Sequence, residues 1–261
     1  MLPYVSLFGR LIPMYGVMIL LGAAVSLLYF RHLEKRSDFP EADAELALVY
    51  SVVGVFVGAK LLWLATVWPE FVEELPCLFS VPKEFLRKYL SGGFVFYGGL
   101  FGAFFAAWLY CRINKLSFFA LARLLMPVVP LFHGFGRLGC FFMGCCYGCV
   151  SDTFGIRFTH SEIAPNGVAL FPVQLIEAAA EFLLFFMLAG FAEKKGSGKA
   201  MFCTWLLSYG ALRFVLEFFR GDKYRGFLGI LSVSQILSLA AIVLGIVTLV
   251  YSLKQSSPVR A

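Results

Sequence analysis

The chain has 261 residues, with 22 Lys and Arg against 16 Asp and Glu, so its formal charge is +6. Hydrophobic residues make up 60% of it and charged residues only 15%, compared with about 25% charged in an ordinary soluble domain. The interior of a soluble domain of this size cannot bury so much apolar surface, which excludes a disordered chain and a soluble cytosolic enzyme. The modest, dispersed charge gives no indication of nucleic-acid binding.

Seven stretches approach the roughly 20 apolar residues that a helix needs to cross a bilayer. They predict an all-α, polytopic membrane protein with a single membrane domain, residues 1–261. The predicted spans are 12–30, 46–68, 94–111, 116–135, 171–191, 200–219 and 230–252. No small-residue cleavage site follows the first span, so we expect it to be retained rather than removed as a signal peptide. If Arg137 and Arg220 are set aside as functional, the Lys and Arg residues of the loops favour an outside N-terminus.

Two connecting segments are long, residues 69–93 and 136–170. The first contains VPKEFLRKYL, which predicts an amphipathic helix lying on the membrane surface. The fourth span is predicted to be broken by Arg123, Pro127, Pro130 and His133. The Gly- and Cys-rich stretch HGFGRLGCFFMGCCYGC follows. Irregular backbone at membrane depth is tolerated only inside protein or beside a wet cavity. With Arg137 in its middle, this stretch is the strongest candidate site; the alternative is a purely structural Gly-rich turn.

The fifth span opens with FPVQLIEAAAEF. Pro172 suits the first turn of a helix. Gln174 and Glu177 are three residues apart and Glu181 is four further on, so the spacing places them on one helical face. They are either part of a site or polar residues near the membrane interface.

The sixth span contains Tyr209, Arg213 and Glu217 at successive intervals of four, with Arg220 three residues later. This spacing predicts that all four share one helical face. An ionisable group inside a span costs about 2.5–3.5 kcal/mol on insertion scales, so its presence needs a reason. One reason is an Arg213–Glu217 pair that locks the helix to its neighbours. The other is a polar wall facing a cavity, where guanidinium groups bind phosphate oxygens in pairs.

Four of the seven cysteines crowd into one segment, with the spacing C-x4-C-C-x2-C: Cys140, Cys145, Cys146 and Cys149. This is not a usual zinc pattern, although Cys146 and Cys149 alone have a compatible spacing. A membrane metal or redox protein is therefore an alternative function for the chain.

Taken together, these motifs resemble the prolipoprotein diacylglyceryl transferase family. The family segment Gly-Arg-x-Gly-Asn-Phe, which runs on to a Glu and a Gly, corresponds to GRLGCFFMGCCYG at 136–148. Three further family stretches correspond to PVQLIE at 172–177, YGALRFVLEFFR at 209–220 and SQILS at 234–238, and an early Tyr-Gly corresponds to residues 15–16. The matches are in order and cover nearly the whole chain.

The resemblance implies an enzyme that moves the diacylglyceryl group of phosphatidylglycerol onto the lipobox cysteine thiol of a preprolipoprotein and releases glycerol 1-phosphate. It also implies the bacterial cytoplasmic (inner) membrane as location. This chemistry needs a thiolate nucleophile and a stabilised phosphate leaving group, so we expect no metal or other cofactor. A catalytically inactive relative that binds lipid is the remaining alternative. The residues expected to act are Arg137 and Arg213, which by this resemblance would hold the phosphate of the lipid headgroup, and Tyr97. Those expected to bind substrate are Tyr15, Lys60, Gly98, Gly99, Cys140, Cys145, Gly148, Gln174, Glu177, Tyr209, Glu217 and Arg220.

The sequence departs from the family pattern where protons would be handled. The family's His-Gly-Gly is Tyr97-Gly98-Gly99, the Asn of its signature is Cys140 and the Glu is Cys145. An Arg of the second span appears as Lys60. Tyrosine, with a reference pKa near 10, is a poor base, so we expect Tyr97 to donate a hydrogen bond instead.

Overall fold

A computed structural model describes residues 3–7, 9–222 and 226–256. Within them, seven helices are long and apolar enough to cross a membrane, which confirms the predicted polytopic helical class. These seven are α1 (Met14–Glu34), α2 (Glu41–Thr66), α6 (Phe96–Ile113), α7 (Phe118–Met143), α8 (Val173–Glu193), α9 (Gly198–Leu216) with its 3-10 extension η1 (Glu217–Phe219), and α10 (Val233–Ser256). The chain divides into two compact units, residues 1–38 with 119–261 and residues 39–118, and the expected single membrane domain stays a prediction.

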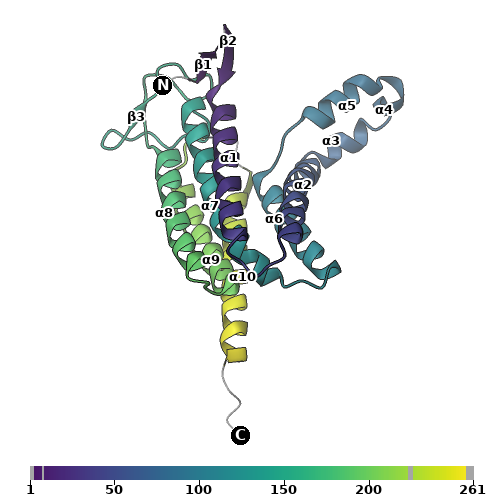
Figure 1. Cartoon of the computed structure of the whole chain (residues 1–261). Helices are drawn as coiled ribbons and strands as arrows, with labels where there is room; N and C mark the ends of the chain where they lie inside the picture. Colours follow the sequence, from purple (N-terminus) through teal and green to yellow (C-terminus); the bar gives the residue numbers. More distant parts are fainter. Residues whose placement is uncertain (1–2, 8, 223–225, 257–261) are drawn as a thin grey trace. The chain divides into compact units, whose positions relative to one another are not determined.

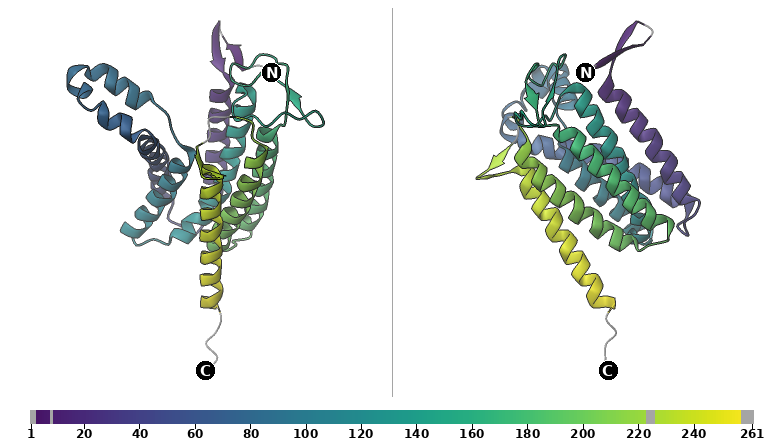
Figure 2. Two further views of the ribbon diagram at one scale, coloured as in Figure 1. Left: turned by 180° about the vertical axis from the view of Figure 1, so that it is seen from behind. Right: turned by 90° about the vertical axis from the view of Figure 1, so that its left-hand side faces the viewer.

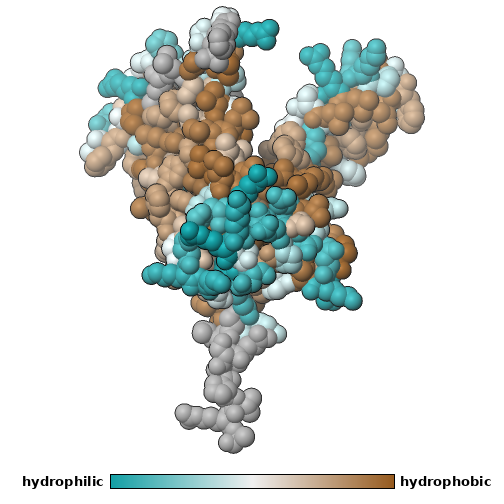
Figure 3. Space-filling model, viewed as in Figure 1, coloured by the Kyte–Doolittle hydropathy of each residue, from teal (hydrophilic) through white to brown (hydrophobic). Residues whose placement is uncertain are grey.

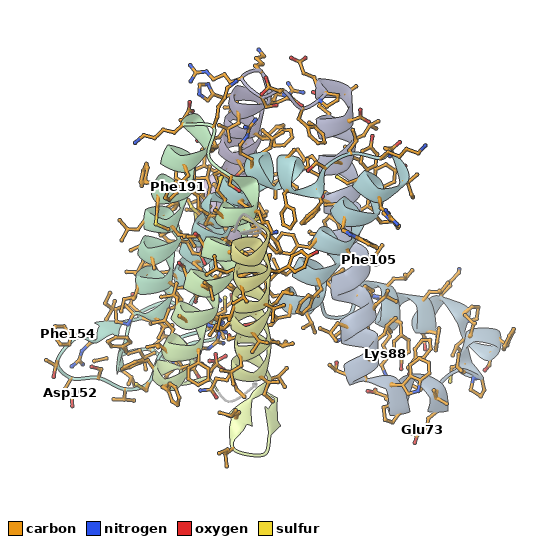
Figure 4. All side chains as sticks on the ribbon, turned by 90° about the horizontal axis from the view of Figure 1, so that it is seen from below. Glu73, Lys88, Phe105, Asp152, Phe154 and Phe191 are labelled. Carbon is orange, nitrogen blue, oxygen red and sulfur yellow. The ribbon has the colours of Figure 1, made fainter. Side chains whose placement is uncertain are left out.

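The first unit contains α1, α7, α8, α9 and α10, which Figures 1 and 2 show as a bundle. Three short antiparallel hairpins accompany it: β1 (Tyr4–Leu7) with β2 (Arg10–Pro13), β3 (Ile156–Arg157) with β4 (Ala169–Leu170), and β5 (Phe227–Leu228) with β6 (Leu231–Ser232). Apolar residues cover much of its surface in Figure 3. Phe154 and Phe191 are exposed and project outward in Figure 4. Such a surface is suited to lipid rather than water.

The fourth span differs from its prediction. Helix α7 runs without interruption from Phe118 to Met143, through both Pro127 and Pro130, so the expected break is wrong and the span is eight residues longer at its C-terminal end. Prolines are tolerated in such helices because neighbouring groups satisfy the backbone carbonyls that they leave unpaired. Irregular backbone begins only at Gly144, whose φ of 74° is a conformation that favours glycine.

The second unit contains α2 and α6, together with three short helices, α3 (Trp68–Glu73), α4 (Cys77–Ser80) and α5 (Pro82–Ser91). Helix α5 includes most of the segment that was expected to be an amphipathic helix, and it is helical as predicted. Its Lys88, labelled in Figure 4, forms ion pairs with Glu70 and Glu74. These contacts join α5 to α3 and to the residue that follows α3.

Helices α2 and α6 cross at glycines. A Cβ atom added to Gly58 would lie 2.2 Å from the carbonyl oxygen of Gly98, and one added to Gly54 would lie 2.3 Å from that of Gly102. Each helix thus presents two glycines four residues apart, the small-residue pattern that lets membrane helices approach closely. Gly98, expected to bind substrate, therefore has a packing role that its family resemblance did not indicate.

Candidate functional site: a buried arginine–glutamate cluster

Three helices of the first unit bring charged side chains together in its interior. Arg137 of α7 donates a hydrogen bond from Nη2 to Oε1 of Glu177 of α8, at 2.8 Å. The other carboxylate oxygen of Glu177 lies 3.5 Å from Nη1 of Arg213 of α9. Arg213 also pairs with Glu217, with 3.1 Å between Nη2 and Oε2. One carboxylate therefore faces both arginines that the sequence predicts to bind the phosphate.

The cluster is electrically balanced and almost completely buried. Glu177 is fully buried and Arg213 and Glu217 are 5% and 3% exposed, whereas Arg137 is 9% exposed. Removing one member of such a network leaves an uncompensated buried charge, which is strongly destabilising. Among the described residues, Nε of Arg137 has no hydrogen-bond partner. Since a guanidinium carries five N–H donors, Glu177 can orient this group while other donors stay available for a ligand.

A second, partly buried pair lies next along α7 and α8. His133 and Glu181, each four residues from a member of the arginine cluster, approach to 2.9 Å between Nδ1 and Oε1. The ring of His133 also meets Tyr209 edge-on, with 5.5 Å between ring centroids. Tyr209 also stacks on Trp205 of its own helix. Because Tyr209 meets His133 of α7 and Arg213 meets Glu177 of α8, the predicted polar face of the sixth span packs against polar groups of two other helices.

The signature segment, residues 136–149, is joined at its C-terminal end by backbone hydrogen bonds to Phe171, just before α8, and to Phe219 of η1. The Cys149 amide donates to the Phe219 carbonyl, and the Phe171 amide donates to the Cys149 carbonyl, each at 2.8 Å. Gly148 bridges to Arg220, and a Cβ atom at Gly148 would lie 2.2 Å from the Phe171 carbonyl oxygen. Gly148 is thus required by this close approach of two backbones.

The side chain of Gln174 fastens the same segment, because its Nε2 donates to the carbonyl of Cys145 at 2.8 Å. Tyr15 packs against α7 near its C-terminal end, because a Cβ atom at Gly139 would be 3.0 Å from the Tyr15 ring. Tyr15 is 42% exposed. Both residues therefore lie in the first unit beside the signature segment.

Three of the four clustered cysteines come together. The sulfur atoms of Cys140, Cys145 and Cys146 all lie within 4.8 Å of one another. The pKa of the Cys146 thiol lies below its ordinary range, because hydrogen bonds from Cys140 and Cys145 stabilise its thiolate and Arg137 and Arg220 attract it, against the effect of burial. The segment therefore favours a negative charge among three sulfur atoms.

Arg220 does not share the helical face of Arg213, so that part of the sequence prediction is wrong. The α-helix ends at Leu216 and one 3-10 turn follows, after which the chain is extended at Arg220. Its Nε donates to Oδ1 of Asp222 at 2.8 Å. The spacing rule fails here because it assumes a helix that continues for one more turn.

The remaining predicted residues lie in the second unit. Tyr97 is 7% exposed, and Gly99 is buried beside it at the start of α6. Lys60 donates from Nζ to the carbonyl of Gly92 at 3.1 Å and lies over the Trp63 ring, 4.2 Å from its centroid. These contacts give Lys60 a role in joining α2 to the segment before α6, and its role in binding substrate stays a prediction.

Sequence reasoning missed two features that the structure makes plain. The glycine pattern of α2 and α6 was readable as Gly54–Gly58 and Gly98–Gly102, two pairs with three residues between the glycines. The His133–Glu181 pair was signalled only by two ionisable residues in apolar spans. Its partners come from different helices, so no spacing within one helix could identify the pair.

Seven apolar helices in the described part of the chain, and a buried arginine–glutamate cluster among three of them, define a polytopic membrane protein with an internal polar site. A model of the family described as "Prolipoprotein diacylglyceryl transferase" matches residues 4–251. The chain belongs to this family.

Relatives with the family's name agree over nearly the whole chain. The phosphatidylglycerol–prolipoprotein diacylglyceryl transferase of Clostridium tetani (strain Massachusetts / E88) is 33% identical, covering 92% of this chain and 93% of its own. Transferase 2 of Clostridium perfringens (strain 13 / Type A) is 33% identical, with 92% and 91% covered. The enzyme of Rickettsia rickettsii (strain Sheila Smith) is 32% identical, with 98% and 97% covered.

Proposed function

We propose that this protein transfers the diacylglyceryl group of phosphatidylglycerol to the cysteine thiol of a prolipoprotein. The observation that carries the proposal is the full-length match to the family and to relatives named for this reaction. The acceptor's thiolate attacks the carbon of the diacylglyceryl group that is joined to the phosphate through oxygen, forming a C–S bond. The C–O bond breaks, and glycerol 1-phosphate leaves with its electron pair.

The geometry of the arginine cluster supports a role for its two arginines in holding the phosphate of the leaving glycerol 1-phosphate. Arg137 and Arg213 face the same carboxylate from two helices, which fixes the separation and orientation of their guanidinium planes. Oriented donors aimed at developing negative charge are an effective means of lowering a barrier, because they need no rearrangement during the reaction. In this proposal Glu177 and Glu217 are positioning residues, and Tyr97 donates a hydrogen bond to a substrate oxygen.

The proposed location is the bacterial cytoplasmic membrane with the N-terminus outside, so that the acceptor is a lipobox segment presented at the outer side. The support is the charge distribution of the loops together with the family resemblance. A cysteine-accessibility experiment with membrane-impermeant reagents, on residues introduced before α1 and after α10, tests this orientation.

The activity is tested with purified, reconstituted protein, phosphatidylglycerol and a synthetic lipobox peptide. We expect a diacylglyceryl thioether on the peptide and one glycerol 1-phosphate released for each peptide modified, both by mass spectrometry. A matched peptide with Ser in place of the lipobox Cys should give neither product. If folded protein releases no glycerol 1-phosphate with the Cys peptide, the proposed transfer is wrong and the alternative of a catalytically inactive relative is favoured.

A further inference from the structure

The three clustered thiols are held together by the turn that ends α7. Cys140 lies in the last turns of the helix, and the amide of Cys145 donates back to its carbonyl at 3.1 Å. Gly144 and Cys146 both have positive φ, 74° and 57°, which folds the chain back on the helix end. The left-handed conformation costs a non-glycine residue such as Cys146 about 1–2 kcal/mol. Hydrogen bonds from Gln174 and within the turn maintain it.

The arrangement suits one thiophilic metal ion. Zinc–sulfur bonds of about 2.3 Å imply roughly 3.8 Å between two sulfur atoms that ligate the same tetrahedral ion. The three sulfur atoms already lie within 4.8 Å of one another, so small side-chain rotations bring them to this separation. Three thiolates select soft or borderline ions such as Zn²⁺ over Mg²⁺ or Ca²⁺. From the sequence, a metal site at these cysteines was only an alternative, because their spacing is not a usual zinc pattern.

The number of ligands indicates what kind of site this is. Cys149 does not belong to the group of three within the described part of the chain, so a tetrahedral ion would keep a fourth position. Structural zinc sites are closed by four protein ligands, whereas reactive sites leave one position for water or substrate. A thiol that coordinates such an ion is deprotonated. The acceptor substrate of the proposed reaction carries a thiol that must lose its proton.

We propose that Cys140, Cys145 and Cys146 bind one Zn²⁺, which takes the acceptor cysteine thiol as its fourth ligand and holds it as a thiolate. This inference rests on the proposed function. Cys140 is three residues from Arg137 on α7, so the two share a helical face. Gln174, which binds the turn, is likewise three residues from Glu177, which binds Arg137. The thiol and phosphate sites are therefore neighbours.

The step balances without a redox partner. On coordination the thiol proton passes to solvent, and the zinc-held sulfur attacks the glycerol carbon as the C–O bond breaks. The glycerol 1-phosphate leaves with the electron pair, and the zinc remains Zn²⁺ throughout. The product sulfur is a thioether, which carries no charge and is a weaker ligand than a thiolate, so the lipidated product dissociates from the metal.

Metal binding is measured first, on full-length protein purified in detergent under reducing conditions and stripped with a chelator. We expect one Zn²⁺ or Co²⁺ per chain, with thiolate-to-cobalt charge-transfer absorption. Cys140→Ser and Cys146→Ser should each weaken binding at least tenfold. The matched control is Cys149→Ser, in the same segment but outside the group of three, and it should bind as wild type does. No bound metal, or equal loss in the control, overturns the inference.

The fourth position is tested on the wild-type chain, so the result does not depend on whether a variant folds. Adding the lipobox Cys peptide to the Co²⁺ protein should increase the charge-transfer absorption, and the Ser peptide should not. A spectrum that responds equally to both peptides, or to neither, overturns the proposal. A disulfide within the group of three cysteines in protein isolated from cells overturns it too.

Transfer assays separate this inference from the proposed function. Stripped protein should transfer at least tenfold more slowly than the same protein reloaded with Zn²⁺. Full transfer by metal-free protein refutes the zinc site and leaves the transferase function intact. Absence of transfer in both states, together with a cobalt spectrum that responds to the Cys peptide, supports the thiol-binding metal site and contradicts the transferase function.

Discussion

Replacing Glu177 by Gln tests whether this carboxylate orients both arginines. The amide oxygen can still accept from Arg137, but the amide nitrogen would then lie near Nη1 of Arg213, 3.5 Å from the atom it replaces. Two donors would face each other, and the cluster would carry one uncompensated positive charge. The ion pair between Arg213 and Glu177 is lost, and leaving a buried charged group without its partner costs about 1–3 kcal/mol or more. If this loss appears in the transition state, transfer should fall by about 10- to 100-fold.

The expected decrease in transfer is informative, because the added positive charge would by itself favour binding of the anionic lipid. An added positive charge beside an anionic headgroup should tighten phosphatidylglycerol binding, so a slower transfer reports lost orientation. The matched control is Glu181→Gln, one turn further along α8 and equally buried, which pairs with His133 instead of an arginine. Transfer rate, lipid affinity and thermal unfolding are measured for both variants. Wild-type transfer by Glu177→Gln, or an equal loss in the control, would refute the reasoning.

Three further predictions concern other parts of the molecule. Arg137→Lys and Arg213→Lys should each reduce transfer at least tenfold while the protein still inserts, because lysine lacks the bidentate fork; near-normal transfer by both would contradict the phosphate assignment. Gly58→Ala should lower the unfolding temperature, since overpacking costs about 1–3 kcal/mol, whereas Gly190→Ala, where the structure shows open space, should not. Tyr97→Phe should weaken transfer by the ~0.5–3 kcal/mol of one hydrogen bond and Tyr97→His should be tolerated; abolished transfer at every pH with unchanged lipid binding would make Tyr97 a direct chemical participant.

The spans were predictable because each rests on composition within a single segment. Length and apolarity locate a membrane helix without knowledge of its neighbours, and all seven appear within a few residues of their expected starts. The exception is the C-terminal end of α7. Prolines and glycines at 127–139 signal irregular backbone in water-soluble helices, whereas in a membrane helix surrounded by protein they are accommodated.

Only the contacts of the site that lie within a single helix could be predicted from the sequence. The spacing of Arg213 and Glu217 indicated their pair correctly. Nothing in the spacing showed that Glu177 faces arginines from two other helices, or that three cysteines with an unusual spacing have neighbouring sulfur atoms. These contacts depend on how α7, α8 and α9 pack, which no pattern within one segment specifies.

The backbone ties of the signature segment have a consequence for the order in which the protein is made. Residues 147–149 bond to Phe171 and to residues 219–221, which leave the ribosome later. Chains emerge N-terminus first, so the fourth span and the segment that follows it are synthesised before the partners of that segment exist. Polar backbone groups near the membrane require partners. The buried arginine–glutamate cluster, which includes Arg213 of the sixth span, is therefore completed only once that span has inserted, which makes completion of the site a late event in biogenesis.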